Sequence, residues 1–294
     1  FTTWRSHHGP ITRRTEDGRW IATALMEEPM RALIQSYSRT KASNLDEYLE
    51  VMQSHTNSSN NTLFADAEGN IAYLHSNFVP IRDASLDYDR PVDGSDPGTD
   101  WQGIHSIDES PNAINPSTGF AYCTNNWPWS AAGTASPRAE DYPRYMDRGS
   151  ENPRGIHALE LLPGRTDFTL DGLVEAAYDT RLPLFDDLIP ALVADLGALD
   201  SAGDARAAAL DPAVRALEGW NRRWSVESTE TSLAIFWVTE LRRVVDSDAG
   251  LAAPDHSEER LAALEAAIAR LEADFGTWQT PWGEINRFQR VNGD

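Results

Sequence analysis

The sequence is poor in cysteine, in basic residues and in long apolar runs. A single cysteine, Cys123, excludes an internal disulfide and leaves the redox compartment open. The sequence has only 25 Lys and Arg but 46 Asp and Glu, which gives a net charge of −21. This charge argues against a nucleic-acid-binding surface, which needs clustered basic residues. The longest apolar patch, LAIFWV, is far shorter than the about 18 apolar residues of a membrane span. We therefore expect neither nucleic acid nor membrane as a partner.

The patterns of common metal sites are also missing. His7 and His8 are adjacent, and neighbouring side chains on a strand point to opposite faces, so we do not expect this pair to form a two-histidine site. No HExxH motif accompanies them. The acidic stretches DAEGN and DYDRPVDGSD lack the spaced acids and closing Glu of an EF-hand loop. The sequence therefore predicts no metal ion and no cofactor.

Turn and cap signals predict a β-rich first part. Two extended runs within residues 1–28 flank the turn TEDG, and the strands TLFA and IAYLHS flank the turn DAEGN within residues 60–76. Between these hairpins, Asn44 is a candidate N-cap for a helix whose apolar residues follow at helical spacing. The segment from Val79 to about residue 153 is rich in Pro, Gly, Asn and Trp, which favours ordered, packed loops.

The second part of the chain is predicted to be helical. Several amphipathic segments follow residue 152, and the last clear one, SEERLAALEAAIARLEADFG, has one apolar face and ends at Gly276. With about 40% apolar residues and 10 Trp, the chain can form a substantial core. We expect an α+β protein, with a β-rich segment and ordered loops over residues 1–130 and a mainly helical, knob-like region over residues 131–294.

Three long motifs occur in a recognisable order. They are FTTWRSHHGPI, NTLFADAEGNIAYLHSNFVPIR and DWQGIHSIDESPNAINPSTGFAYCTNN. They resemble, in order and spacing, the W-R-T-x-H-G strand, the N-x-x-Y-A-D-x-x-G-N-I-G-Y…P-x-R hairpin and the W-x-G…N-P-x-x-G run of the penicillin acylase family. Near the C-terminus, TPWGEINRFQR is similar to a motif of the branch that acts on acyl-homoserine lactones.

The resemblance implies an N-terminal nucleophile hydrolase with the αββα fold. In that family a precursor cleaves itself, and the new N-terminal Ser attacks an amide with its own α-amine as base, for which an amine pKa of about 8 suits neutral pH. The present chain opens with Phe1 and has no such serine. We therefore expect a truncated β-chain that is inactive alone and whose partner is the rest of its precursor, the α-chain and the N-terminal part of the β-chain. The resemblance also implies a periplasmic or extracellular location.

Two residues match catalytic positions of the family. Asn61 matches the asparagine whose side-chain amide donates to the oxyanion, although an Asn beside a turn also commonly caps its own backbone. Asn60 is adjacent, and strand alternation allows only one of the two to point into a site. Arg82 matches the arginine of P-x-R, which in the family lies near that asparagine and the nucleophile's amine. The alternative for Arg82 is a salt bridge at the surface of an acidic protein.

The expected substrate is a small-molecule amide with an apolar acyl group. Phe64 and Trp127 are candidates for lining an acyl pocket, although aromatic residues in a mixed fold more often belong to the core. The resemblance suggests either an arylacetyl or an aliphatic acyl group. Two other functions stay open: a non-catalytic scaffold that completes another chain, and a degenerate homologue that binds amides without cleaving them.

Overall fold

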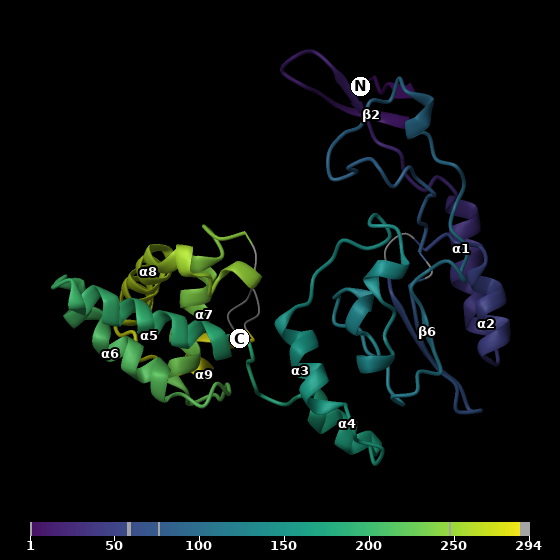
Figure 1. Ribbon diagram of the computed structural model, residues 1–294. Coiled ribbons are helices and arrows are strands. Elements are labelled where there is room, and N and C mark those ends of the chain that lie inside the picture. The colour runs from purple at the N-terminus through teal and green to yellow at the C-terminus, as the bar shows by residue number, and fades with distance from the viewer. Residues whose placement is uncertain (1, 58–59, 76, 247, 289–294) are drawn as a thin grey trace. The chain divides into compact units, whose positions relative to one another are not determined.

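The computed structural model describes residues 2–57, 60–75, 77–246 and 248–288. Within the chain, contacts define two compact units, one of residues 1–151 with 158–166 and the other of residues 152–157 with 167–294. In Figure 1 the first unit runs from purple to teal, and the helical second unit from teal to yellow. Small antiparallel sheets and helices occur together, which confirms the predicted α+β class. The first unit extends beyond residue 130, where the sequence analysis ended the β-rich segment.

The first sheet contains three short antiparallel strands in the order β1-β2-β3. They are β1 (Arg5–Ser6), β2 (Gly9–Arg14) and β3 (Trp20–Ala22). The hairpin predicted around TEDG is the β2–β3 pair, and Gly18 in its turn has a φ of 88°, a conformation that glycine adopts without a steric penalty. The predicted hairpin is therefore confirmed.

His7 and His8 form the turn between β1 and β2 and do not belong to a strand. The expectation that their side chains point to opposite faces was wrong, because it assumed the alternation of a continuous strand. In the turn the two ring centroids are only 3.7 Å apart. Both imidazoles consequently lie on the same side of the hairpin end.

Two helices connect the first sheet to the second. The sequence analysis missed α1 (Pro29–Ser38), which begins with a proline at its first position. It correctly predicted α2 (Leu45–Met52): the Asn44 side chain accepts a hydrogen bond from the backbone N–H of Glu47 at 2.9 Å, and the Glu47 carboxylate accepts one from the N–H of Ser43 at 2.7 Å. These two bonds satisfy N–H groups at the start of the helix that have no partner within it.

The second sheet has the order β4-β5-β6, with β4 (Thr62–Ala65), β5 (Ile71–Leu74) and β6 (Ala113–Ile114). The β4–β5 pair is the predicted DAEGN hairpin; Ser76, the last residue of the predicted second strand, lies outside the described residues. One face of the sheet packs on α2, which lies near β6 in Figure 1, and the other face buries Tyr73 against Ala131 and Ala132. The sheet is therefore covered on both faces.

The long segment after β5 is ordered mainly by turns, short 3-10 helices and side-chain hydrogen bonds. Buried Asn126 donates to Tyr122 Oη at 3.2 Å, to Ser130 Oγ at 3.0 Å and to Glu151 Oε1 at 2.9 Å. These bonds fix the chain around residues 122–130 without a regular ladder. The structure thus agrees with the expectation of packed loops.

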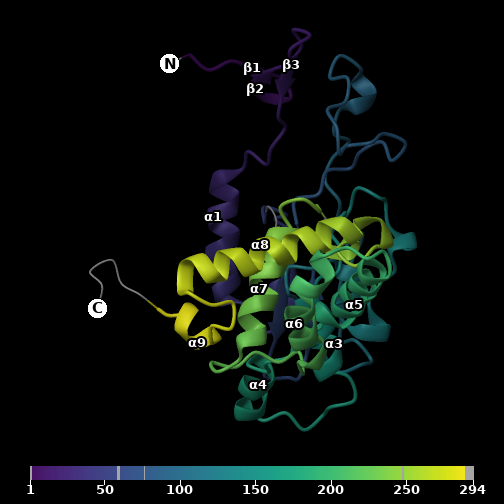
Figure 2. The ribbon, with the colours of Figure 1, turned by 90° about the vertical axis from the view of Figure 1, so that its left-hand side faces the viewer.

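The helical part begins with α3, which is divided between the two units, and continues in the second unit. The helices are α3 (Pro153–Leu161), α4 (Leu170–Ala177), α5 (Phe185–Ser201), α6 (Arg206–Gly219), α7 (Thr229–Leu241), α8 (Ser257–Phe275) and α9 (Trp282–Ile285). Figure 2 shows α8 crossing α7, and the core between the helices includes the fully buried Trp237. Gly276 ends α8 with a φ of 83°, as its position in the sequence predicted. None of the helices in the described residues is long and apolar enough to cross a bilayer.

A buried ion pair joins two helices of the second unit. Arg260 of α8 is 1% exposed, and its Nε lies 2.6 Å from Asp195 Oδ2 of α5. The same guanidinium donates to the carbonyls of Leu251 at 3.0 Å and Ala253 at 2.6 Å. Because both charges are paired and the guanidinium has further acceptors, their removal from water is largely offset.

Candidate active site

Asn61 lies directly before β4, at the lip of the second hairpin. The register pairs Thr62 with Leu74, so the next position outward places Asn61 opposite His75. His75 Nδ1 lies 2.7 Å from Asn61 Oδ1. The neighbouring Asn60 is exposed, whereas Asn61 is half-buried. Of the two asparagines, Asn61 is the one directed into the protein.

His75 is a buried and firmly held residue. It is 5% exposed, and its backbone N–H donates to Asn112 Oδ1 at 2.7 Å. Its Nε2 lies 3.4 Å from the carbonyl of Met146 and 3.6 Å from Asp147 Oδ2. Burial lowers the pKa of His75, and the charge of Asp147 opposes this effect only in part. Because the amide oxygen of Asn61 can only accept a hydrogen bond, a proton on Nδ1 donates to it in this contact and fixes the amide plane.

The NH₂ group of Asn61 points toward sulfur. Asn61 Nδ2 lies 3.7 Å from Cys123 Sγ, and a thiol is a weak hydrogen-bond acceptor. Because the Asn61 carbonyl is held by His75, its two N–H donors are oriented but have only this weak partner among the described residues. Such an oriented donor can bind an oxygen that carries a developing negative charge.

Arg82 lies where the chain leaves the hairpin and is enclosed by two tyrosines. Its guanidinium carbon is 5.2 Å from the ring centroid of Tyr88 and 5.8 Å from that of Tyr145. Its backbone N–H donates to Tyr145 Oη at 3.2 Å, and its buried Nε has no partner within the described residues. Burial lowers the pKa of Arg82, although a guanidinium stays protonated at neutral pH. Arg82 is therefore a partly desolvated cation held by aromatic rings.

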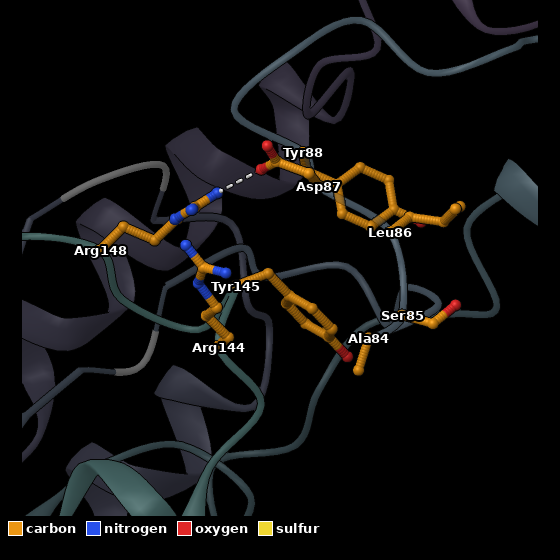
Figure 3. Close-up of a pocket in the computed structure, with 8 residues that line it drawn as sticks. All are labelled: Ala84, Ser85, Leu86, Asp87, Tyr88, Arg144, Tyr145 and Arg148. Atoms are coloured by element: carbon orange, nitrogen blue, oxygen red, sulfur yellow. Dashed lines mark hydrogen bonds and ion pairs between the residues drawn. The ribbon is translucent and has the colours of Figure 1, made fainter.

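A short segment, residues 145–147, connects the two predicted site residues. The Tyr145 hydroxyl contacts Arg82, while Met146 and Asp147 contact His75, which holds Asn61. Figure 3 shows Tyr145 in the small pocket that lies beside this segment, with Arg144 and Arg148 nearby. Hydrogen bonds between Arg82 and Asn61 are absent from the described part of the chain, so the structure links them through residues 145–147.

The two candidate pocket residues occupy different places. Phe64 is two residues beyond Thr62 on β4 and packs its ring 4.9 Å from that of Tyr48 on α2, on the face of the sheet opposite Asn61. Trp127 precedes the 3-10 helix Pro128–Ser130, four residues after Cys123, and its buried Nε1 has no acceptor in the described ranges. Trp127 thus belongs to the segment that reaches Asn61, and Phe64 belongs to the core beneath α2.

Comparison with known proteins agrees with this geometry. The family model for penicillin amidase matches residues 1–293. The chain belongs to the penicillin amidase family. This confirms the resemblance seen in its three motifs, and it places the chain in a family of acylases and amidases. A few residues of the three motifs and of the C-terminal TPWGEINRFQR motif lie outside the described residues; they are residues 1, 76, 289 and 290.

Two relatives of this penicillin amidase family member are informative. The chain is 30% identical over 134 residues to penicillin G acylase of Escherichia coli, which is 44% of this chain and 15% of that protein. The structure resembles that of a thermostable penicillin G acylase from Alcaligenes faecalis, with a TM-score of 0.65 and 21% identity, covering 96% of this chain and 59% of the other. This structural similarity confirms the predicted N-terminal nucleophile hydrolase fold. The chain thus spans less than two thirds of either relative's length.

Sequence reasoning missed the partners of both predicted residues in this penicillin amidase family member. His75 could have been found, because a DAEGN turn that pairs Ala65 with Ile71 also places residue 61 opposite residue 75. Tyr145 had no such signal, since it lies 63 residues from Arg82. Residues this far apart meet only through the path of the irregular segment between them.

Proposed function

We propose that this chain is part of an amidase that hydrolyses an amide with an apolar acyl group through an acyl-serine intermediate. The observation that carries the proposal is the Asn61 amide, whose carbonyl is fixed by buried His75 and whose NH₂ has Cys123 Sγ as its one partner among the described residues. Membership of the penicillin amidase family supports the reaction class. The nucleophilic serine is contributed by sequence outside residues 1–294, so we expect these residues alone to be inactive.

The proposed reaction follows from the charges that form in it. The serine oxygen adds to the amide carbon, its proton passes to the serine's α-amine, and the former carbonyl oxygen becomes an oxyanion. Asn61 donates an N–H to this oxygen, an interaction that contributes about 3–4 kcal/mol in the transition state. Collapse of the intermediate expels the amine, which takes the proton, and water then hydrolyses the acyl-serine by the same steps.

Arg82 is proposed to position the site without touching the reacting atoms. It binds Tyr145 through its backbone and both tyrosine rings through its guanidinium. Since Met146 and Asp147 follow Tyr145 and contact His75, an ordered Arg82 keeps the support of His75 in place. The pocket roles of Phe64 and Trp127 stay predictions; the location of Trp127 on the Cys123 segment favours it over Phe64.

The proposed partner is the remainder of the same precursor. One face of α1 exposes four apolar side chains at helical spacing: Met30 (67% exposed), Leu33 (65%), Ile34 (56%) and Tyr37 (66%). An apolar stripe of this kind is typical of a surface that another polypeptide covers. The periplasmic or extracellular location is likewise proposed from the family, and cell fractionation of the native host tests it.

The decisive experiment uses the complete gene product, including the sequence upstream of residue 1. The protein is incubated with a phenylacetyl anilide and a long-chain acyl anilide, and the reaction is stopped early for intact-mass measurement. Release of aniline and a serine-linked acyl adduct are expected. Binding of the anilides without release would instead support the degenerate amide-binding homologue. Neither binding nor release, with the chain still associated with the rest of the protein, would favour the non-catalytic scaffold.

A further inference from the structure

Three side chains with metal-binding atoms converge at the turn between β1 and β2. They are His7, His8 and Asp100, whose ligand atoms all lie within 4.8 Å of one another. Asp100 Oδ1 is 3.5 Å from His8 Nδ1 and 3.7 Å from His7 Nε2. Around a tetrahedral zinc ion, bonds of about 2.0–2.1 Å separate the ligand atoms by about 3.3 Å. The two separations from Asp100 Oδ1 exceed this spacing by only a few tenths of an ångström.

The His8 imidazole is already oriented for coordination. Its Nε2 lies 2.8 Å from the carbonyl of Gly94, so Nε2 carries the proton and donates to that oxygen. The ring nitrogen left to offer a lone pair to a metal ion is then Nδ1, the atom that faces Asp100. Metal-ligating histidines usually donate their other ring N–H to a carbonyl or carboxylate in this way.

The loop that carries Asp100 is held by its own hydrogen bonds. Asp96 accepts from the N–H of Gly98 at 2.8 Å and caps the 3-10 helix Pro97–Thr99, after which Asp100 follows directly. The Thr99 hydroxyl donates to the carbonyl of Asp93 at 3.1 Å. The carboxylate is thus presented by a defined loop, and a site supported in this way loses less freedom when it binds an ion.

The surroundings of the cluster also suit an ion. A Cβ added to Gly94 would lie 2.9 Å from His8 Nε2, so the absence of a side chain at this position allows the close approach of the ring to the loop. The side chains of His7 and Asp100 are 69% and 44% exposed, which leaves room for an ion to enter and for water to complete its coordination.

We propose that His7, His8 and Asp100 bind one divalent transition-metal ion, with zinc as the best match. Two imidazole nitrogens and one carboxylate oxygen suit zinc and its neighbours, whereas calcium and magnesium prefer sets made only of oxygen. The ion ties the β1–β2 turn to the loop 93–100, segments that are far apart in the sequence. This role is separate from the proposed chemistry at Asn61.

The test is calorimetric titration of the complete gene product with zinc chloride, after chelator treatment and with a purification tag free of histidine. One zinc ion per chain is expected, and His8→Ala and Asp100→Ala each weaken its binding at least tenfold. Gly94→Ala, which removes no ligand, also weakens it by displacing the His8 ring. The matched control is His256→Ala, because His256 has a carboxylate neighbour, Glu259 at 3.9 Å, but belongs to no three-ligand group among the described residues.

Circular dichroism checks that each variant is folded. Should His8→Ala unfold, His7→Ala gives the same readout, since its exposed side chain contributes little to packing. Stoichiometric zinc binding that is lost in the site variants and kept in His256→Ala supports the proposal. The proposal is overturned by the absence of stoichiometric zinc binding, by equal affinities in all variants, or by calcium binding at the site in place of zinc.

Discussion

His75 Nδ1 lies 2.7 Å from Asn61 Oδ1, and this contact decides where the Asn61 amide points. The two residues face each other across the β4–β5 hairpin, so the register of the hairpin sets their distance. Since one side of the amide is bound to a buried ring, the other side presents its N–H groups to Cys123. A fixed donor needs no reorganisation as negative charge develops, which is the condition for transition-state stabilisation.

Replacing His75 should reduce catalysis through Asn61. In the complete protein, His75→Ala removes the hydrogen bond that holds the amide, and we expect kcat to fall about 10- to 100-fold with a smaller change in KM. His75→Gln can still reach Asn61 and should recover part of the loss. Steady-state kinetics of both variants provide the measurement. Equal kcat in His75→Ala and the native enzyme would show that the contact does not position the amide.

The buried state of His75 predicts a pH dependence of stability. Burial lowers its folded pKa below the ordinary value of 6.5, so the unfolded chain binds the proton more readily. The contribution of neutral His75 is complete above pH 6.5 and is lost as the pH falls through the folded pKa. Urea unfolding of native protein and His75→Gln at pH 7.5 and 5 should show a smaller acid loss in the variant. If the loss of unfolding free energy between pH 7.5 and 5 were the same in both proteins, His75 would not be the group responsible. His55, whose pKa is also lowered by burial, is present in both proteins and so cannot cause a difference between them.

Arg82 should contribute to stability as well as to activity. Arg82→Ala removes a cation packed between Tyr88 and Tyr145, and we expect the free energy of unfolding to fall by about 1–2 kcal/mol. Arg82→Lys keeps the charge but not the planar guanidinium, so kcat should still fall. Arg90→Ala, at an exposed position eight residues later in the sequence, is the control. If both alanine variants unfolded at the same urea concentration, the packing of Arg82 against the two tyrosines would not contribute to the free energy of unfolding.

The helical unit depends on the ion pair between Asp195 and Arg260. Asp195→Ala leaves a guanidinium that is 1% exposed without its carboxylate, and we expect a loss of about 3–5 kcal/mol in unfolding free energy. Asp200→Ala removes an exposed carboxylate from the same helix and should change stability little. Chemical denaturation monitored by tryptophan fluorescence compares the two. Similar midpoints for both variants would mean that the pair is energetically neutral.

Local signals explain most of what the sequence predicted correctly. Asn44 and Glu47 form the cap that starts α2, and Gly18 and the DAEGN turn lie at the ends of the two predicted hairpins. Each of these depends on a few neighbouring residues. The helix α1 lacks such a start signal, because Glu28 at its N-cap makes no side-chain capping hydrogen bond and its first turn has no acidic residue.

The sites formed by distant residues were less accessible to prediction. Asn61 was identified through the family motif, but identifying His75 as its hydrogen-bond partner requires the register of the hairpin. The contact between Arg82 and Tyr145 joins residues that are 63 positions apart in the sequence. His8 and Gly94 are 86 residues apart in the sequence, and no local pattern in either segment indicates that they meet. Such contacts depend on loop paths that no local periodicity encodes, which is why the site appears only in three dimensions.

The most direct test of the central claim is the kcat of Asn61→Ala in the complete protein. If Asn61 donates to the oxyanion, kcat should fall about 10²- to 10³-fold while the melting temperature changes little. Asn60→Ala, one position away and exposed, should keep native kcat. A variant at Asn61 with native kcat per folded molecule, or one that loses activity only because it unfolds, would contradict the assignment of the oxyanion donor.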